Sequence, residues 1–396
     1  MVQNLARFNQ ACVSRSARLE RMWDGQRLKF AWNKLEVLTL DGRARPVALT
    51  WKGRQYRRGL DGTCKEILRV PGPERDFYDA AAVEPAEFEE LLRGWGERLG
   101  QHYAIDCEDW IVRLRADARD FASLYRPISI LPPDQYRSLV LQLTEGCAYN
   151  RCSFCNLYRD RPYRCKDARE FGRHLAGVLA YFGAALPWRR GIFLGDANAA
   201  GVSTRRLLEA LEQIRQTFPS RQPHPLEFDR VSCFQDTFTG KLRALEDWRA
   251  LRRLGLTQVH LGVESGSSEV LRLLQKPLAN QRVVELVGRL QEAGIQVSLI
   301  FLLGAGGRQL AREHLEQTRR LLSQLQLTPG DRIYLSDLLV HSGSDYATLS
   351  EQQGLQPLSR WECRQQAREL RESLNLPAPP RGTPVALYDV RQFVYV

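Results

Sequence analysis

Three cysteines, Cys147, Cys152 and Cys155, stand close together in the pattern C-x4-C-x2-C. They follow an apolar run at 138–143 that has the composition of a buried strand, so we expect them on the loop where that strand ends. Thiolates are the ligands of iron–sulfur clusters, and three on one loop can hold three irons of a four-iron cluster. The fourth iron then lacks a protein ligand, so it can bind a substrate or cofactor and pass it an electron.

Other metal sites are possible with the same cysteines. Two cysteines three residues apart are a common zinc pattern, and Cys165 could complete a site of four thiolates. A zinc knuckle usually has two short C-x-x-C pairs, however, and this chain has one. Unliganded thiols buried in a core are a third interpretation. The spacing favours the iron–sulfur cluster over both.

The residues around the cysteines resemble the radical S-adenosylmethionine (radical SAM) superfamily. The similarity is carried by Leu131-Pro-Pro-Asp134, Leu141-Gln-Leu-Thr-Glu-Gly-Cys147, Arg151-Cys-Ser-Phe-Cys155 and the run 158–164. It is greatest with the branch often labelled Fe–S oxidoreductase. The commonest spacing in the superfamily is C-x3-C-x2-C, so the first gap here has one additional residue. The resemblance implies a [4Fe-4S] cluster on Cys147, Cys152 and Cys155.

The resemblance also implies an activity. In the superfamily the open iron chelates the amino and carboxylate groups of S-adenosylmethionine (SAM). Reduction of the cluster cleaves SAM to methionine and a 5′-deoxyadenosyl radical, which abstracts a hydrogen from the substrate. An electron donor such as flavodoxin or ferredoxin is the implied partner. We therefore expect an enzyme with oxidoreductase chemistry, whose substrate and net reaction these residues do not specify.

After Pro132-Pro133, strand-like runs alternate with helical patterns, which indicates a parallel β/α array. Strands are expected at 139–143, 191–194, 226–233, 258–262, 297–303 and 332–338. Helices are expected at 167–182, 204–218, 281–293 and 310–325. These six units fit the partial (β/α)6, TIM-like barrel that the resemblance implies. In such barrels, functional groups gather at the C-terminal ends of the strands.

Further motifs of the resemblance stand where these strands end. After the second strand, Gly195, Asp196 and Asn198 occupy the place of a motif that hydrogen-bonds the amino group of SAM. After the fourth, Glu264 and Ser265 belong to a Gly-Val-Glu-Ser-Gly motif whose carboxylate is implied to lie near the SAM ribose or amino group. Ribose hydroxyls and an ammonium are both donors, so an acceptor is useful there. A strand-to-helix turn and a helix cap are the simpler interpretations.

Three more contacts are implied by the resemblance. Gly304 opens the run Gly-Ala-Gly-Gly after the fifth strand, where glycine would let the backbone approach adenine. Phe154 stands at the aromatic position between the last two cysteines, which contacts adenine in relatives, although simple loop packing explains it equally well. Ser336, in the sixth strand, is expected on the substrate side. No catalytic residue is assigned.

The residues before the barrel predict a separate domain. Turn signals at Asp41-Gly42 and Lys52-Gly53 indicate a small antiparallel sheet over 27–70, and an amphipathic helix is expected from Pro85. The segment 27–70 holds eleven basic and four acidic residues, a net charge of +7. We expect domains at 1–126 (basic, α+β), 127–345 (radical SAM partial barrel) and 346–396 (a C-terminal helix and extension).

The basic sheet raises a second functional hypothesis. Its arginines and lysines are interleaved with Trp32, Trp51 and Tyr56, which could form a stacking and phosphate-binding surface for RNA, such as tRNA. A half-buried sheet with solvated arginines is the favoured alternative. The charge of the whole chain, +11 over 396 residues, suits anionic partners such as nucleic acid or an anionic small molecule without choosing between them.

The bulk composition predicts a cytoplasmic protein. No run of eighteen apolar residues occurs, so no membrane span is expected, and the sequence begins without an apolar signal core. Six of the nine cysteines are scattered singly, which suits a reducing compartment. A non-enzymatic zinc or iron–sulfur module remains the alternative from outside the enzyme class.

Overall fold

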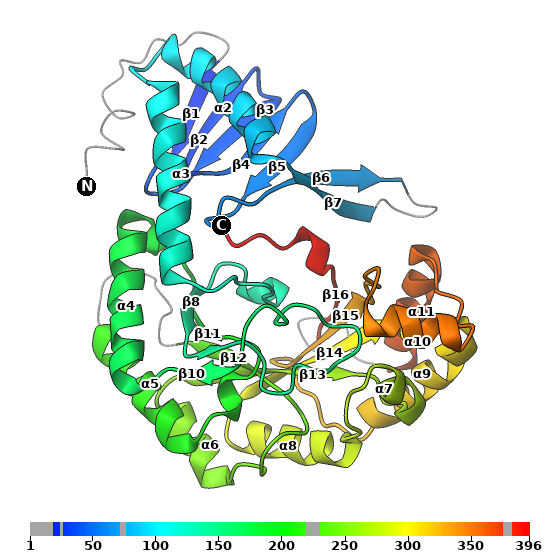
Figure 1. The fold of residues 1–396 in the computed structure, drawn as a ribbon. Helices are drawn as coiled ribbons and strands as arrows, with labels where there is room; N and C mark the ends of the chain where they lie inside the picture. Colours follow the sequence, from blue (N-terminus) through cyan, green and yellow to red (C-terminus); the bar gives the residue numbers. More distant parts are fainter. Residues whose placement is uncertain (1–18, 24–26, 72–76, 219–229, 375–381) are drawn as a thin grey trace.

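Two sheets of seven strands organise the chain, one antiparallel and one parallel (Figure 1). The structure is a computed structural model that describes residues 19–23, 27–71, 77–218, 230–374 and 382–396. Part of the expected strand 226–233 lies outside the described residues, as does Cys12. The fold confirms the predicted α/β class with an N-terminal α+β part.

The antiparallel sheet follows the chain order strand by strand. Its strands are β1 (Leu19–Trp23), β2 (Leu28–Trp32), β3 (Glu36–Leu40), β4 (Pro46–Trp51), β5 (Arg54–Arg58), β6 (Cys64–Val70) and β7 (Phe77–Val83). The two predicted hairpins are confirmed, between β3 and β4 and between β4 and β5. Two helices follow, α2 (Pro85–Gly100) and α3 (Cys107–Leu124), and the predicted boundary at 126/127 falls just beyond α3.

The aromatic residues of the first domain agree with the favoured alternative, a half-buried sheet. Tyr56 is 2% exposed, and Trp32 and Trp51 pack against the same buried cluster. The rings of Trp51 and Trp95, which is on α2, have centroids 6.4 Å apart. The guanidinium carbon of Arg98 lies 4.0 Å from the centroid of the Trp51 ring. These rings therefore pack against the core of the domain, with Trp32 and Trp51 half-buried.

The parallel sheet has the order β16-β15-β14-β13-β12-β11-β8. Its strands are β8 (Leu139–Gln142), β11 (Ile192–Gly195), β12 (Val231–Gln235), β13 (Leu256–Glu264), β14 (Gln296–Leu303), β15 (Arg332–Asp337) and β16 (Val385–Tyr388). Every neighbouring pair is parallel, and β8 and β16 are the two open edges among the described residues. The sheet is thus the predicted partial barrel, extended by β16 as a seventh strand.

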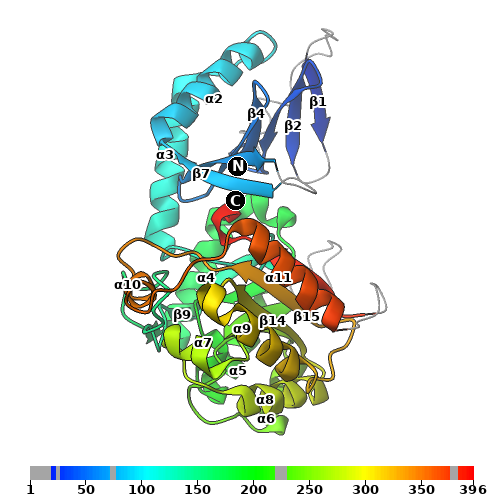
Figure 2. The ribbon, with the colours of Figure 1, turned by 90° about the vertical axis from the view of Figure 1, so that its right-hand side faces the viewer.

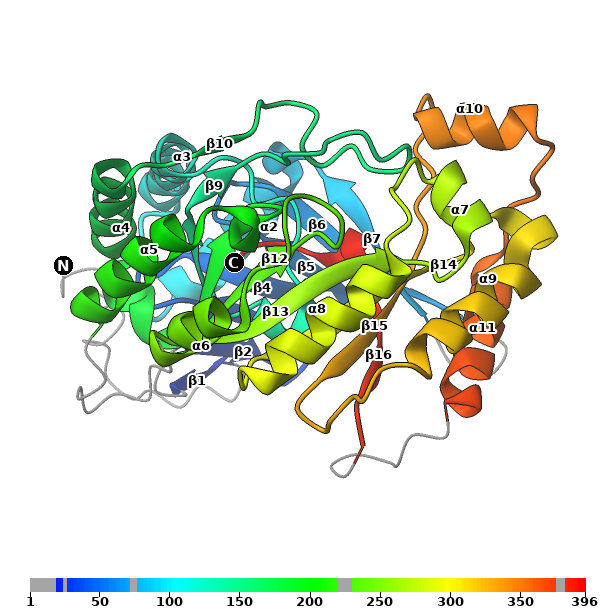
Figure 3. The same cartoon turned by 90° about the horizontal axis from the view of Figure 1, so that it is seen from below.

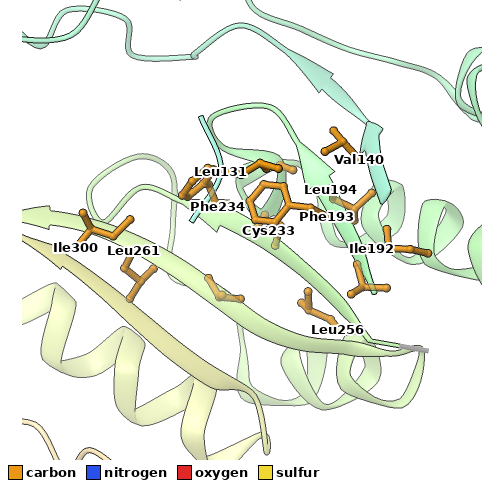
Figure 4. Close-up of a cluster of buried hydrophobic side chains, with 14 of the residues drawn as sticks. Leu131, Val140, Ile192, Phe193, Leu194, Cys233, Phe234, Leu256, Leu261 and Ile300 are labelled. Atoms are coloured by element: carbon orange, nitrogen blue, oxygen red, sulfur yellow. The ribbon is translucent and has the colours of Figure 1, made fainter. Parts of the chain in front are cut away.

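Helices cover the outer face of the parallel sheet (Figure 3). They are α4 (Ala168–Phe182), α5 (Thr204–Thr217), α6 (Leu245–Arg253), α8 (Asn280–Glu292), α9 (Gly307–Leu322) and α11 (Arg360–Ser373), with α7 (Ser268–Leu273) and α10 (Asp345–Gln352) at the loops. Ser203 caps the N-terminus of α5, because its side chain accepts a hydrogen bond from the Arg206 N–H. Strands buried on both faces supply the core, including Phe193, Leu194 and Leu261 (Figure 4).

The segment after β16 passes between the two sheets (Figures 1 and 2). On one side, Lys65 of β6 donates hydrogen bonds to the carbonyl oxygens of Arg391 and Phe393, at 2.7 and 2.9 Å. On the other, the Tyr395 hydroxyl accepts from the Val140 N–H at 3.0 Å, and β8 contains Val140. This segment therefore connects the first domain to the barrel.

Candidate functional site

A cavity of about 230 Å³ lies at the C-terminal ends of the parallel strands. All three cysteines of the C-x4-C-x2-C motif line it. Opposite them are residues that end or follow the strands, among them Asn198 after β11 and Glu264 at the end of β13. This is the edge of the sheet at which parallel β/α folds place their functional groups.

The cysteine loop is held in place by its own backbone and by α7. Gly146, just before Cys147, has a φ of 75°, and a Cβ there would lie 2.9 Å from the Pro162 carbonyl oxygen, so glycine is required. Between the last two cysteines, the Ser153 N–H donates to the Leu274 carbonyl at 3.0 Å, and its hydroxyl donates to the Leu273 carbonyl at 2.6 Å. The loop is thus fixed at both ends of the motif.

Burial disfavours the thiolate form of Cys152 and Cys155 in the absence of a metal. Burial raises the pKa of Cys152 to about 12 and also raises the pKa of Cys155. A bound metal reverses this preference, because a coordinating thiol is deprotonated. Among the described residues, no three His, Cys, Asp or Glu side chains converge as ligands of one ion. The thiolates of a four-iron cluster each bind a different iron, so they do not need to converge in that way.

A closed zinc site that includes Cys165 does not fit this arrangement. Cys165 lies in the short strand β10 (Arg164–Cys165), paired with Thr144 of β9 (Thr144–Glu145), and it is not among the residues that line the cavity. The three motif cysteines therefore fit a cluster with one iron free of protein ligands, and the alternative with a fourth thiolate has no support in the geometry.

Asp196 braces the cysteine loop from behind the cavity. The buried carboxylate accepts hydrogen bonds from the Gly146 N–H at 3.1 Å and from the Gln142 amide at 3.3 Å. The guanidinium of Arg161 lies 3.5 Å away. Burial raises the pKa of Asp196 to about 6 despite this cation. Gly195, the last residue of β11, is likewise buried behind the cavity lining.

Asn198 does line the cavity, and a hydrogen-bond network fixes its side chain. The Asn198 amide donates to the carboxylate of Asp236 at 2.7 Å and accepts from the Asp236 N–H at 3.1 Å. The hydroxyl of Thr239 in turn donates to the same carboxylate at 2.5 Å. Asp236, which also lines the cavity, was not predicted from the sequence.

A buried ion pair lies beside the cysteines. Lys276 donates hydrogen bonds to the Glu264 carboxylate at 2.7 Å and to the Gly262 carbonyl at 2.6 Å. Burial lowers the pKa of Lys276, but attraction to Glu264 and Cys152 outweighs it, so its pKa is raised above the ordinary value. Glu264 has a φ of 67°, a strained conformation for a residue with a side chain, of the kind that clusters at functional sites.

The other predicted cofactor contacts divide into two groups. Phe154 and Ser336 line the cavity, as do Asn198 and Glu264. Ser265 is fully buried, and its hydroxyl lies 2.7 Å from His314 Nδ1, where it shapes the turn before α7. The Gly304 N–H donates to the Gln366 amide oxygen at 2.9 Å. Gly195, Asp196, Ser265 and Gly304 are therefore supports of the lining, and direct contact of any of the eight with SAM stays a prediction.

The arginines after the cysteines are engaged in the structure. Arg159 lies 3.4 Å from Asp345, Arg161 is 2.8 Å from Asp160, and Arg164 is 3.1 Å from Glu145. They stabilise the loop by these contacts and do not form a separate anion site. His341 lines the cavity, and His260 is buried in β13.

No helix among the described residues is long and apolar enough to cross a membrane.

Comparison with known proteins places these observations in a family context. Residues 141–322 match the model of the radical SAM superfamily. The 4'-phospho-dehydrooxetanocin synthase of Priestia megaterium is 20% identical over 215 residues, which is 50% of this chain and 28% of that protein. The chain thus spans less than a third of the length of this curated relative.

Three solved enzyme structures are similar to the chain. The methyltransferase TsrM from Kitasatospora setae has 18% identity and a TM-score of 0.41, covering 58% of this chain and 41% of its own. Coproporphyrinogen III oxidase (HemN) from Escherichia coli has 15% identity and a TM-score of 0.42. The match covers 60% of this chain and 52% of HemN. Methylornithine synthase (PylB) has 15% identity and a TM-score of 0.41. The match covers 64% of this chain and 72% of PylB.

Proposed function

Because the chain belongs to the radical SAM superfamily, we propose that it cleaves SAM reductively at a [4Fe-4S] cluster and abstracts a hydrogen atom from its substrate. The family uses this cluster and SAM, and its enzymes generally need a reductant such as flavodoxin or ferredoxin. The cofactors supply the difficult chemistry, and the protein binds and orients them.

The observation that carries this proposal is the composition of the cavity at the strand ends. The three cysteines of the motif, the Glu264–Lys276 pair and Asn198 come from distant parts of the sequence, yet they line a single cavity. A packing role alone does not require two charged residues and three thiols around one space, because buried charges are costly unless they are paired and used.

The proposed roles of the residues follow from their positions. Cys147, Cys152 and Cys155 would hold three irons of the cluster. Lys276 fixes the Glu264 carboxylate, which would accept hydrogen bonds from the ammonium or the ribose hydroxyls of SAM. Asn198, held by Asp236, would present polar atoms to the same ligand.

The remaining cavity wall suits protection of a radical. Ile300 and Leu302 of β14 line it together with Phe234 of β12. An apolar wall excludes water and prevents side reactions of a reactive intermediate. Ser336 and His341, on the β15 side, are the polar groups that would face the substrate.

The direct test is anaerobic reconstitution of the full chain with iron and sulfide, followed by dithionite and SAM. We expect wild type to bind iron and sulfide and to form 5′-deoxyadenosine. Cys152→Ala should lose both properties, because it removes one of three protein ligands. Cys165→Ala is the matched control, since Cys165 lies outside the cavity lining, and it should retain both.

Two outcomes would contradict the proposal. Equal loss of metal in Cys165→Ala and Cys152→Ala, with zinc and no sulfide in the wild type, would indicate the closed thiolate site. Iron and sulfide at wild-type levels in Cys152→Ala would show that the motif does not hold the cluster. An RNA-modifying role remains the alternative for the substrate, and retention of tRNA that weakens steeply with added salt would support it.

A further inference from the structure

The guanidinium of Arg159 binds the backbone of two motif cysteines. Its Nη2 donates a hydrogen bond to the Cys152 carbonyl at 3.2 Å, and its Nε donates to the Cys155 carbonyl at 3.3 Å. One side chain thus spans the C-x2-C turn from the first cysteine of the pair to the second. Arg159 does not line the cavity at the strand ends, so it contacts the turn from outside, where 44% of its side chain is exposed.

Helix α10 contacts the same turn. The carboxylate of Asp345, in its first turn, lies 3.4 Å from the Arg159 guanidinium. The next residue, Tyr346, donates its N–H to the Ser153 carbonyl at 3.1 Å. This N–H is one of the donors that the first turn of a helix leaves without an intrahelical partner. Figure 3 shows α10 beside α7, whose last residue also binds Ser153. The turn between the two cysteines is therefore fixed by Arg159, α10 and α7 together.

An exposed ion pair alone does not explain this arrangement. The Asp345 side chain is 57% exposed, and pairs between exposed side chains contribute little to stability. The contact with Asp345 uses Nη2 of Arg159, whereas Nη2 and Nε both reach cysteine carbonyls. The geometry therefore directs the charge of Arg159 at the cysteine pair as well as at the carboxylate.

We propose that Arg159 is a positioning residue of the cluster site and sets how readily the cluster takes up an electron. The inference rests on the proposed function, because it requires a cluster on Cys147, Cys152 and Cys155. Reduction adds one negative charge, and a nearby cation favours the more negative form. Net charge and hydrogen bonds are among the determinants of the reduction potential of iron–sulfur clusters. Arg159 supplies both at one turn.

Asp345 on α10 limits the effect of this cation. Its carboxylate offsets part of the Arg159 charge, and its exposure to water leaves that offset partly screened. Helix α10 lies outside residues 141–322, the part of the chain that matches the family model. A segment beyond the family match therefore adjusts a property of the cluster site in this chain.

Arg164 of the same loop is engaged differently. Its guanidinium binds the carboxylates of Glu145 and Glu170, each at 3.1 Å, and its side chain is 48% exposed. Within the described part of the chain it forms no hydrogen bond to a motif cysteine. Arg164 therefore matches Arg159 in charge, loop and exposure but lacks the contacts on which the proposal depends, which makes it the control.

The test of the charge is an anaerobic redox titration of the reconstituted full chain, monitored by electron paramagnetic resonance. At a fixed potential, Arg159→Gln should lower the ratio of reduced to oxidised cluster about tenfold, which is a midpoint potential lower by about 59 mV. Arg159→Lys keeps the charge and should retain most of the wild-type ratio. Arg164→Gln should change the ratio by less than about threefold.

Removal of the partner carboxylate should act in the opposite direction. Asp345→Asn leaves both contacts of Arg159 with the cysteine carbonyls in place and removes one negative charge. The ratio of reduced to oxidised cluster should rise by about threefold at low ionic strength and by less at high ionic strength, because this carboxylate is exposed. A fall of the ratio in both Asp345→Asn and Arg159→Gln would indicate general disturbance of the loop and contradict the proposal.

The hydrogen bonds of Arg159 are tested separately from its charge. The ammonium of Arg159→Lys lacks the planar fork that reaches both carbonyls. This variant should therefore release iron to a ferrous-iron chelator at least about threefold faster than wild type, although its potential is nearly unchanged. Arg164→Gln should release iron at the wild-type rate. Equal rates in Arg159→Lys and wild type would remove the positioning role.

Further results would overturn the proposal. These are a wild-type potential in Arg159→Gln, or equal shifts in Arg159→Gln and Arg164→Gln. An unchanged potential with slower reduction by flavodoxin would assign Arg159 to docking of the electron donor instead.

Should Arg159→Gln fail to assemble a cluster, Asp345→Asn decides, and the absence of a rise in its ratio would sink the inference. A wild type without iron and sulfide would contradict the proposed function itself. A complete cluster with unshifted variants would contradict this inference alone.

Discussion

The two sheets of this chain have the same number of strands but treat their charged residues differently. In the antiparallel sheet, cations are held by neighbours in the same domain: Arg45 pairs with Asp41 at 2.7 Å, and Arg98 stacks on Trp51. In the parallel sheet, the strands are mostly apolar, and charged groups such as Glu264 and Lys276 lie at the cavity by the C-terminal ends. The number of charges is thus a poor guide to a site, whereas their position in the fold is a good one.

The segment 27–70 illustrates this difference. Its net charge of +7 and its aromatic residues raised the hypothesis of a nucleic-acid surface, with a half-buried sheet as the favoured alternative. Tyr56 is buried, and Trp32 and Trp51 are half-buried against the same core. The barrel part offers fewer distinctive residues, and yet its topology brings them to one cavity. The following four experiments test this contrast between a structural and a functional use of charge.

The largest effect is expected from Lys276→Met. The variant leaves the Glu264 carboxylate buried without its cation, which should lower the free energy of unfolding by about 3–5 kcal/mol. Chemical denaturation measures this loss, and calorimetry should show weaker SAM binding. In the double variant Glu264→Gln, Lys276→Met much of the stability should return, because the lone charge is gone. A single variant as stable as wild type would mean that the pair is not needed.

A pH titration of stability tests the buried histidine of the barrel. Burial lowers the pKa of His260 to about 4, below the ordinary value near 6.5. The unfolded chain therefore takes up a proton that the native state excludes, and stability should fall as the pH decreases from about 6.5 to 4. In wild type this protonation should lower the free energy of unfolding by about 3 kcal/mol at pH 4, and His260→Leu should lack this decrease. If the free energies of unfolding of wild type and variant changed equally with pH across this range, the prediction would be wrong.

In the first domain, Arg98→Ala on α2 should be destabilising without affecting the cofactors. The side chain stacks on Trp51 and forms an ion pair with Glu36, so its removal should cost about 1–3 kcal/mol in the free energy of unfolding. Arg98→Lys keeps the charge but lacks the planar guanidinium. Its free energy of unfolding should therefore lie between those of wild type and Arg98→Ala. Iron content and SAM affinity of the folded variant should equal those of wild type. A drop in either would give this cation a role in the site.

The smallest effect is expected from Arg113→Ala on α3. Arg113 pairs with Asp109 one turn earlier, and both side chains are more than two-fifths exposed. Exposed pairs of this spacing contribute about 0.3–0.5 kcal/mol, and the contribution should vanish at high salt. Thermal unfolding at low and high ionic strength measures it. A loss above about 1 kcal/mol would show that charge on this surface is used for more than solvation.

Sequence patterns predicted the barrel well because its strands are uniformly apolar and its longer helices are strongly amphipathic. The helix expected at 204–218 is α5, at 204–217. The short helices α6, α7 and α10 have nine, six and eight residues, too few for a reliable period, and were not predicted. The strand at 385–388 lies in the segment 346–396, for which only a helix and an extension were predicted.

Only those parts of the site that have a local sequence signal were predicted. Cysteine spacing and the residues after each strand are local signals, so Cys147, Asn198, Glu264 and Ser336 could be found. Lys276 was missed because its contact with Glu264 depends on the path of α7 between them. The single available signal is a lysine two residues after the segment 270–274, which is apolar except for Arg272. Asp196 was found, but its role behind the loop depends on a contact with Gly146, fifty residues away in the sequence.

The short segment that follows β16 has a mechanical consequence. Its backbone is anchored by Lys65 on one sheet, and its Tyr395 hydroxyl is bonded to β8 on the other. The first domain and the barrel cannot rotate against each other unless these hydrogen bonds break. We therefore expect the first domain and the barrel to unfold in one cooperative transition. A destabilising substitution in the first domain should then also lower the stability of the barrel, although none of the described residues of that domain lines the cavity.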